Sequence, residues 1–589
     1  MPSTYRDSRV FVFIFPAILL LLLCVATYGN ILSHNFFMLD DYRLLIRPAQ
    51  TEHRLSDFFL KSDDQHYAPL NAIVNVVLFK VFQKPFPLLL INLILFYINC
   101  FLLFIFVYLL SREFITALLT SIIFCVHPMS GEILQHITFN ILMIQTIFIQ
   151  LGLIALYLYS KSDKRVAYYF FSIFMVILAL FCQEIVLLFP LYAAALLFFF
   201  TDFDLKKIVK TLIPFVLLDL LLILLILFIS SQNVHLFQCI ERLGLSFWSW
   251  GANFFHLILW YISNLFYPND IVFMYNVGPL RSWIWLWVML FGGFLIGGGV
   301  LVFYCFKKSL ESFCIVLFLI GFIYAIPASL IRPDIGFVFE PYWFYFSSMG
   351  FYLFIVLMLL RFKKYINKTI FSIFLLTLFV FYFICTQEIN INASSTLRYF
   401  ENWLQKSPHN PIPMRNLALI YSYKKNIDIP AAFTSDMLSI LNFYIRNDSP
   451  EISLKLINKI SSSKISFDQR RQLHFLLAAY HCKYGLNDKC NAISHQILSK
   501  SPNDPYIYMQ LSDVFYEVNL LDRAMDLLEQ CKVLYPRFKE VYLLEGLILE
   551  RKRNYKDSIS TFKQGAAIDP TDLRFILNID RVRKVTHQM

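Results

Sequence analysis

The sequence predicts an all-α protein in two parts, a polytopic helical membrane domain followed by an α-solenoid. Hydrophobic residues make up 58% of the 589 residues, whereas roughly 45–50% is typical of a soluble domain. Of the 51 basic and 40 acidic residues, 27 and 21 follow residue 387, and an internal repeat occupies the same region. We therefore expect a membrane domain over 1–387 and a repeat domain over 388–589. This composition excludes a secreted enzyme, a cytosolic enzyme and a disordered protein.

Eleven apolar runs in the first part are predicted to cross a bilayer. The first run follows two arginines, and no small-residue cleavage site comes after it, so we interpret it as an uncleaved span and not as a signal peptide. The runs are Val10–Tyr28, Phe86–Leu110, Phe114–His127, Ile137–Ser160, Val166–Phe181, Ile185–Phe200, Ile208–Ser230, Trp283–Phe306, Phe313–Ile331, Tyr342–Leu360 and Thr369–Cys385.

The positions of the basic loops predict the orientation. With the N-terminus in the cytoplasm, the loops at 161–165, 206–207, 307–308 and 361–364 all face the cytoplasm, as the positive-inside rule requires. A crossing at Phe247–Tyr267 would break this pattern, so we expect a helix there that lies on or dips into the outer face. An odd number of spans then places the repeats outside the cytoplasm.

Two long outer segments are expected between the spans, at 30–85 and 231–282. The first contains a helix-like stretch from Asn71 to Phe82, and long ordered loops are common places for functional sites. The second carries Trp248, Trp250 and Trp260, with Trp283 just beyond it. Tryptophans at that level either anchor the chain at the membrane interface or stack on a sugar.

The C-terminal part contains an internal repeat. Pro502, Pro536 and Pro570 recur 34 residues apart, which is the tetratricopeptide period. The same interval separates three small residues at which paired helices approach closely, and shorter series of small and large apolar residues keep the phase. These positions are Ala478, Ser512 and Gly546, then Ala524 and Ser558, then Leu528 and Phe562. We predict about four or five helical pairs, which stack into a surface that binds proteins or peptides.

Ionisable residues at the outer ends of spans are candidates for a site, because they are costly near a membrane. Asp40 and Asp41 follow the first span, and two adjacent carboxylates either supply a general base or form a solvated turn or cap. His127 and Glu132 flank Pro128 after the third span, where they either face a cavity or begin a capped helix. Further candidates are Glu184 in a tight turn, Glu340, and Arg332, which either holds a phosphate or reaches to the interface.

Together these segments resemble the C-type membrane glycosyltransferases, most closely the transmembrane-and-tetratricopeptide O-mannosyltransferase group and its bacterial relatives. The resemblance covers nearly the whole chain. It includes the aspartate pair, Tyr67-Ala68-Pro69-Leu70, Asn92, Phe124-x-x-His127-Pro128-x-x-x-Glu132, Gln183–Glu184, Glu340 before Tyr345-Phe-Ser-Ser-Met-Gly350, and the trailing repeats. It implies sugar transfer from a polyprenyl-phosphate carrier to a protein or glycan acceptor on the outer side, with inversion at the sugar.

The resemblance also implies roles for residues. Asp40 or Asp41 would accept the proton of the acceptor hydroxyl. The donor would be bound by Tyr67, His127, Glu132, Glu184 and Glu340, and Arg332 is added on its position alone. Three cations of the usual pattern are replaced here, by Ala68, Asn140 and Pro341. Either the donor is bound differently, or this chain has lost transfer activity.

Two rival functions remain beside the transferase. A non-catalytic membrane scaffold would recruit partners through its repeats. A glycan polymerase, ligase or flippase would need ionisable residues along an intramembrane path, and Asp219 is the exception in spans that carry almost none. No nucleotide-binding or metalloprotease motif occurs, so we expect no cofactor. One carboxylate pair does not make an octahedral oxygen site, so no metal is expected. Much of the positive charge lies in short loops between apolar runs, where it sets orientation, so nucleic acid is not expected as a partner.

The compartment that the repeats face bears on whether two of their cysteines form a disulfide. The repeats lie either outside a bacterial inner membrane, which we favour, or in the lumen of the endoplasmic reticulum. Cys482 and Cys490 either pair in such an oxidising compartment or pack as small apolar residues.

Overall fold

The structure is a computed structural model of the chain. It describes all residues except 1–3, 35–40, 42–43, 45–57, 60–66, 163–165, 230–246, 270, 278–285, 287, 291, 294–295, 298–308, 329–336, 408–411, 414–415, 418–437, 439–440, 443–444, 446–449, 462–466, 501–503, 570–571 and 588–589. The chain divides into two compact units, Met1–Asn410 and Pro411–Met589.

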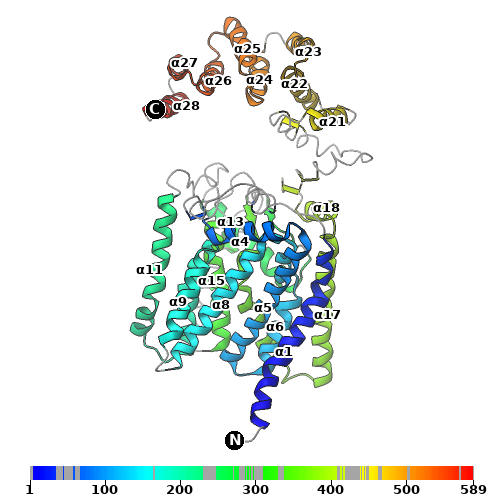
Figure 1. The fold of residues 1–589 in the computed structure, drawn as a ribbon, viewed down its shortest axis with the longest axis vertical. Helices are drawn as coiled ribbons and strands as arrows, with labels where there is room; N and C mark the ends of the chain where they lie inside the picture. The colour runs from blue at the N-terminus through cyan, green and yellow to red at the C-terminus, as the bar shows by residue number, and fades with distance from the viewer. Residues whose placement is uncertain are drawn as a thin grey trace. The chain divides into compact units, whose positions relative to one another are not determined.

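The first unit is a helical bundle (Figure 1). Its α-helices are α1 (Thr4–Tyr28), α4 (Pro69–Phe82), α5 (Pro85–Ser111), α6 (Phe114–Val126), α7 (Pro128–Gly131), α8 (Asn140–Ser160), α9 (Val166–Leu180), α10 (Phe189–Phe200), α11 (Leu205–Ile229), α13 (Phe247–Phe266), α15 (Leu310–Ala328), α16 (Ser348–Phe362), α17 (Lys368–Asn392) and α18 (Thr396–Lys406). Short 3-10 helices are η1 (Gly29–Ser33), η3 (Glu132–Gln135), η4 (Ile137–Phe139), η5 (Glu184–Leu188) and η6 (Pro341–Phe344).

Several of these helices are long and apolar enough to cross a membrane. Five qualify by length and composition among the described residues, namely Val12–Ser33, Pro85–Ser111, Ile137–Ser160, Leu205–Ile226 and Lys368–Asn392, and α6 with the segment after it makes a sixth if that bent pair is one span. Four more predicted spans are shorter apolar helices, at 166–180, 184–200, 310–325 and 348–362. The predicted span Trp283–Phe306 falls largely outside the described residues.

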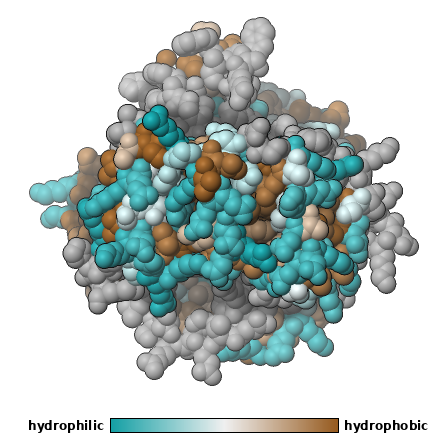
Figure 2. All heavy atoms as spheres, turned by 90° about the horizontal axis from the view of Figure 1, so that it is seen from above, coloured by the Kyte–Doolittle hydropathy of each residue, from teal (hydrophilic) through white to brown (hydrophobic). Residues whose placement is uncertain are grey.

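The outside of the bundle is apolar. Large hydrophobic side chains are exposed on α1, α9, α11 and α17, for example Ile18, Phe170, Leu221 and Ile370. Apolar side chains are unfavourable in contact with water, so these helix surfaces fit a lipid environment. The face of the molecule in Figure 2 differs, because it is mainly hydrophilic with apolar side chains in smaller patches.

One end of the bundle is built from short and irregular elements. Figure 1 shows α4, α13 and α18 at the end opposite the N-terminus. The helix predicted from Asn71 is α4, which begins two residues earlier at Pro69. Two strands, β1 (Tyr275–Val277) and β2 (Phe337–Phe339), pair antiparallel with Tyr275 opposite Phe339. The all-α expectation missed this ribbon because three-residue strands are too short to show an alternating pattern.

The first compact unit extends past residue 387, where the sequence analysis placed the domain boundary, to Asn410. The helix α17 continues to Asn392, and α18 buries Tyr399, Phe400 and Trp403 within the first unit. The Trp403 indole N–H donates to the carbonyl of Met274 at 2.9 Å. Composition changes where the lipid-facing surface ends, whereas the compact unit ends where packing ends, at Asn410.

The second unit consists of paired helices. They are α21 (Pro450–Ser461), α22 (Phe467–Lys483), α23 (Asn487–Lys500), α24 (Pro505–Glu517), α25 (Leu521–Leu534), α26 (Lys539–Arg551), α27 (Tyr555–Ile568) and α28 (Leu573–His587). The small and large apolar residues predicted to keep the repeat phase are buried: Ala478, Ser512, Gly546, Ala524, Ser558, Leu528 and Phe562. The 34-residue periodicity therefore located the helix-crossing points.

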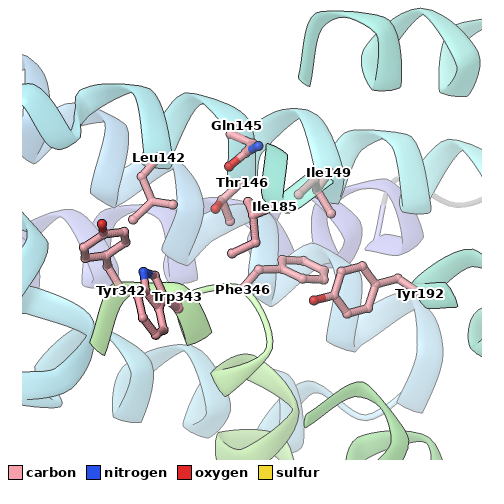
Figure 3. Close-up of a pocket in the computed structure, with 9 residues that line it drawn as sticks. All are labelled: Leu142, Gln145, Thr146, Ile149, Ile185, Tyr192, Tyr342, Trp343 and Phe346. Carbon is pink, nitrogen blue, oxygen red and sulfur yellow. The ribbon is translucent and has the colours of Figure 1, made fainter. Parts of the chain in front are cut away.

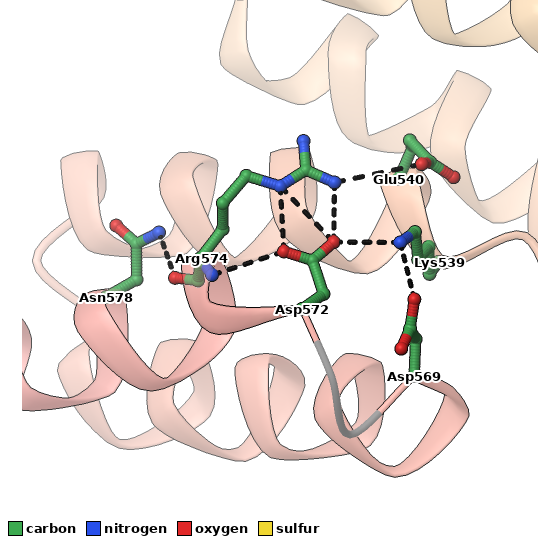
Figure 4. Close-up of polar contacts among 6 residues, drawn as sticks. All are labelled: Lys539, Glu540, Asp569, Asp572, Arg574 and Asn578. Carbon is green, nitrogen blue, oxygen red and sulfur yellow. Dashed lines mark hydrogen bonds and ion pairs between the residues drawn. The ribbon is translucent and has the colours of Figure 1, made fainter. Parts of the chain in front are cut away.

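A network of charges joins the start of α26 to the start of α28 (Figure 4). Lys539 Nζ lies 2.7 Å from Asp569 Oδ2 and 2.9 Å from Asp572 Oδ2, and Arg574 lies 2.6 Å from Asp572. The hydrogen bonds from Arg574 and then Lys539 hold the pKa of Asp572 below its usual value of 3.8. A lowered carboxyl pKa stabilises the fold above that usual value, and the contribution is lost as the pH falls below it.

We expect Asp572→Asn to increase amide hydrogen exchange in α28 at pH 7, because the charge that Lys539 and Arg574 share is removed. The effect is small, since Lys539 and Arg574 are partly exposed to solvent, which screens their charges. Corrected for intrinsic exchange rates, the difference from wild type should shrink below about pH 4. An equal difference at pH 7 and at pH 3 would contradict this explanation.

Cys482 and Cys490 form a disulfide that joins α22 to α23. The turn between these helices contains Gly485, whose φ of +76° is a conformation that glycine adopts without strain. The sequence left open whether these cysteines pair or pack as small apolar residues, and in the structure they pair.

We predict that the two cysteines of this disulfide resist alkylation until the protein is reduced. Full-length protein purified without reductant should be treated with a maleimide, digested and analysed by mass spectrometry, before and after reduction. Labelling of both residues only after reduction is the expected result. Cys531, a buried free cysteine of the same unit, serves as the matched control for slow labelling by burial alone. Labelling of Cys482 and Cys490 in unreduced protein would contradict the prediction.

Candidate functional site

The break between α6 and α7 shapes the irregular end of the bundle. Pro128 cannot continue α6, and the chain turns by 64° between Phe114–Val126 and Pro128–Gln135. His127 is fully buried at this turn. Its Nε2 lies 3.0 Å from the carbonyl of Leu265, and its Nδ1 lies 3.2 Å from the N–H of Met129 and 3.1 Å from the hydroxyl of Tyr352. Both ring nitrogens are therefore engaged by the protein, and His127 fixes the bend.

Glu132 follows this bend and is the main unsatisfied group of the region. Its side chain is only 2% exposed, and no described residue donates a hydrogen bond to either carboxylate oxygen. The amide nitrogen of nearby Gln135 also has no acceptor among the described residues. A buried carboxylate without hydrogen-bond donors is costly, and native structures retain such a group chiefly where a ligand, water or proton completes it.

His136 and Tyr399 lie beside Glu132. The Nε2 atom of His136 is 3.5 Å from Glu132 Oε1 and 3.1 Å from the Tyr399 hydroxyl. Tyr399 comes from α18, so the last helix of the unit reaches this cluster directly. Burial, followed by the charges of Glu132 and Asp41, raises the pKa of Tyr399 well above its usual value of 10. The phenol therefore stays protonated and is available as a hydrogen-bond donor.

Asp41 belongs to the same cluster. It is 2% exposed, and its Oδ1 accepts a hydrogen bond of 3.2 Å from the backbone N–H of Thr138. Because Thr138 follows His136 by two residues, this bond places Asp41 in the same buried region as His136 and Glu132. The outer-end cluster consists of Asp41, Glu132, His136 and Tyr399.

Tyr67 and Glu184 form a separate contact, as the backbone N–H of Tyr67 donates to Glu184 Oε1 at 2.8 Å. The same turn is held from α8, where the Gln145 amide donates to the carbonyl of Gln183 at 2.6 Å. Glu184 thus positions the chain just before α4. This contact brings together two of the residues predicted from the sequence.

Glu340 occupies a third position, directly after β2. It accepts a hydrogen bond from the Tyr342 hydroxyl and another from the Trp343 indole N–H, the latter at 3.0 Å. The Tyr342 ring also contacts Phe139, with ring centroids 4.7 Å apart. Glu340 therefore orients two aromatic side chains that form part of a cavity wall.

Two small cavities lie in this region, and each has room in this structure for about one water molecule. The first lies between α8, η5, α10 and η6 (Figure 3). Its lining residues are Leu142, Gln145, Thr146, Ile149, Ile185, Tyr192, Tyr342, Trp343 and Phe346. The second cavity has polar groups at its wall and is lined by Glu132, Gln135, Ile271, Val272, Phe273, Ile389, Asn392, Tyr399, Asn402 and Trp403. The unsatisfied carboxylate therefore borders the second cavity.

The predicted site residues thus fall into distinct places. Asp41 and Glu132 share the outer-end cluster, whereas Tyr67 pairs with Glu184, Glu340 supports the aromatic wall, and His127 fixes the bend. Asp40 and Arg332 lie outside the described residues. The sequence analysis did not single out His136 or Tyr399. The spacing of Glu132 and His136 in the sequence was a signal that could have identified His136. Tyr399 follows the last span, and no sequence signal pointed to it.

The three positions that lack the usual cations occupy this region too. Ala68 caps α4 beside Tyr67, and Pro341 follows Glu340. Asn140, which begins α8, donates through its amide to Asn75 Oδ1 at 3.0 Å. Neutral side chains fill these positions, so a bound phosphate would receive no positive charge from them.

Comparison with known proteins does not identify a family. No protein-family description matches the chain, and no curated protein does. Among solved structures, a mutant of MamA is similar to the chain with a TM-score of 0.16 and 14% identity, over 26% of this chain and 83% of that one. A similarity this low carries no argument about function.

We expect Tyr399→Phe to weaken the outer-end cluster without unfolding the bundle. The substitution keeps the buried ring and removes only the hydroxyl near His136, so its cost should be about 1 kcal/mol. Purified protein should show a small decrease in thermal stability, and Tyr382→Phe, which removes a longer contact of 3.5 Å, is the matched control. No difference between the two variants would show that the Tyr399 hydroxyl does not hold His136.

Proposed function

We propose that the chain is an integral-membrane glycosyltransferase that moves a sugar from a polyprenyl-phosphate carrier to a protein or glycan acceptor. The observation that carries this proposal is the outer-end cluster, where Glu132 has unfilled acceptor oxygens at a cavity and Asp41 lies in the same buried region. Sugar and acceptor hydroxyls are the donors that such carboxylates lack. The resemblance in the order of motifs along the chain supports the same class.

The proposed step is an inverting transfer. Asp41, or Asp40 beside it, takes the proton of the acceptor hydroxyl as its oxygen attacks the anomeric carbon. The bond from that carbon to the carrier phosphate breaks, and the phosphate leaves with the electron pair. Glu132 accepts hydrogen bonds from sugar hydroxyls, and His136 lies beside it and is held by the Tyr399 hydroxyl.

We place the two ends of a lipid-linked sugar at the two cavities, which have to widen to admit them. The cavity near Trp343 would hold the first units of the carrier, and the cavity at Glu132 would hold the sugar. Glu340 and Glu184 support the walls between them through Tyr342 and Tyr67. His127 takes a structural role in this proposal, and Arg332 stays a candidate for the phosphate.

The proposed topology has 11 spans, a cytoplasmic N-terminus and the repeats on the extracytoplasmic side. The Cys482–Cys490 disulfide supports this orientation, because disulfides persist in oxidising compartments. A bacterial inner membrane is preferred, and the endoplasmic reticulum is the alternative. In either case the repeats would recruit acceptor proteins or other partners.

A second function, a non-catalytic scaffold that recruits partners through its repeats, is favoured by one observation. The positions of Ala68, Asn140 and Pro341 supply no cation to a phosphate. A scaffold retains the bundle and the repeats but requires no particular protonation state at Asp41.

A transfer assay distinguishes the two functions. Purified full-length protein is given polyprenyl-phosphate sugars of several kinds and an extract of host-cell proteins and glycans, with Asp40→Asn and Asp41→Asn beside wild type. Incorporation of labelled sugar by wild type, lost in either variant at equal expression, supports the transferase. Absence of transfer from every donor, with a cellular phenotype that neither substitution changes, supports the scaffold.

A further inference from the structure

Three buried cysteines from three different helices meet inside the bundle. Cys24 belongs to α1, Cys100 to α5 and Cys125 to α6, and each is completely buried. Their sulfur atoms all lie within 4.8 Å of one another, and the Cys24 and Cys125 sulfurs are 3.4 Å apart. Other described cysteines of this unit, such as Cys182 and Cys314, are buried without belonging to such a group. The three-sulfur cluster is therefore a particular feature of where α1, α5 and α6 pack together.

The spacing of the sulfurs fits a single three-coordinate metal ion. Three thiolate sulfurs that each lie about 2.3 Å from one ion are about 4 Å apart when the ion is in their plane. The observed 3.4 Å separation and the 4.8 Å upper limit for the group lie on either side of that value. The group contains no histidine or carboxylate, so the ligand set is entirely soft sulfur. Soft thiolates select Cu(I), whereas Zn²⁺ usually takes four ligands in a tetrahedron.

The surroundings favour a monovalent ion. Phe96 lies one turn before Cys100 on α5, Phe124 directly precedes Cys125 on α6, and the two buried rings stack with centroids 5.8 Å apart. A net charge in such apolar surroundings is costly. Cu(I) bound by one thiolate and two thiols is neutral, and its formation from three thiols releases one proton without electron transfer.

A neighbouring side chain supplies a second observation. Tyr345 is buried, its hydroxyl has no hydrogen-bond partner among the described residues, and it lies within electrostatic reach of all three cysteines. A phenol that has no protein acceptor can donate to a bound thiolate, whose sulfur is a better acceptor than a thiol. The polar group thus gains a partner when one cysteine is deprotonated.

From these observations we propose that Cys24, Cys100 and Cys125 form a Cu(I) site that links α1, α5 and α6. The site is independent of sugar transfer, because none of the three residues belongs to the outer-end cluster. The bound ion connects three helices that are otherwise joined mainly by apolar packing, so it should stabilise the bundle.

The test offers Cu(I), as its coloured bicinchoninate complex, to the reduced full-length protein in detergent without oxygen. Wild type should remove one Cu(I) per chain from the complex. Cys24→Ser, Cys100→Ser and Cys125→Ser should each lower the affinity about tenfold or more, while Cys182→Ser and Cys314→Ser leave it unchanged. A Cys482→Ser/Cys490→Ser variant should also bind one ion, which excludes the reduced disulfide as the site.

A second measurement does not depend on whether the variants fold. X-ray absorption of copper-loaded wild type should show three sulfur neighbours. Coordination by nitrogen or oxygen would overturn the proposal. Uptake by wild type that is no greater than uptake by the Cys24→Ser/Cys125→Ser variant would overturn it as well, and so would an equal loss in Cys182→Ser.

Discussion

Asp41→Asn is expected to lower the rate of sugar transfer by between about a hundredfold and ten-thousandfold, the usual contribution of a general base. Asparagine has the shape of aspartate and keeps an oxygen that can accept the N–H of Thr138, which lies 3.2 Å from Asp41 Oδ1. What the substitution removes is the basic charge. The fold should therefore survive while proton removal from the acceptor hydroxyl fails.

The measurement is the initial rate with a saturating lipid-linked sugar, accompanied by the thermal stability of each protein. Asp202→Asn is a matched control, because Asp202 is an exposed carboxylate at the start of another loop. Asp40→Asn tests the neighbouring residue in the same way. Full activity of Asp41→Asn, with transfer lost in Asp40→Asn, would assign the base to Asp40. Full activity of both would refute base catalysis by this pair.

The positions of the long helices could be predicted because apolar length is a local property of sequence. The predicted run Phe86–Leu110 became α5, and Thr369–Cys385 became part of α17. The repeat phase was predictable for a similar reason, since each small residue recurs where two helices cross. In both cases the sequence pattern predicts which side chains are buried, and the structure buries those side chains.

The contents of the outer-end cluster could not be predicted in the same way. His127 and His136 look alike as sequence features, yet Leu265, far along the chain, engages the first and Tyr399 engages the second. Partners more than 100 residues away decide which histidine is structural and which borders Glu132. Tyr399 follows the last span, and nothing in the sequence indicated that it packs against this cluster.

Phe562→Ala is expected to destabilise the C-terminal unit by about 3–5 kcal/mol, which is typical when a large buried side chain is truncated. The Phe562 ring is fully buried and packs in a cluster with Phe575, Ile579 and Val582 of α28. Its loss leaves a cavity between α27 and α28. Amide hydrogen exchange in α26–α28 of the full-length protein should rise strongly, whereas Leu577→Ala, at a side chain 67% exposed, should change it little.

The contact between Phe562 and Gly546 allows a sharper test. A Cβ atom on Gly546 would lie 2.4 Å from the Phe562 ring, closer than atoms can approach without a shift. Gly546→Ala alone should therefore destabilise the unit, because the ring must move. Combined with Phe562→Leu, the same alanine should cost less than it does alone, since the smaller side chain leaves room for it. Strictly additive effects on exchange in α26 and α27 would show that the two residues do not press on each other. The repeat period would then mark a burial pattern and not a steric contact.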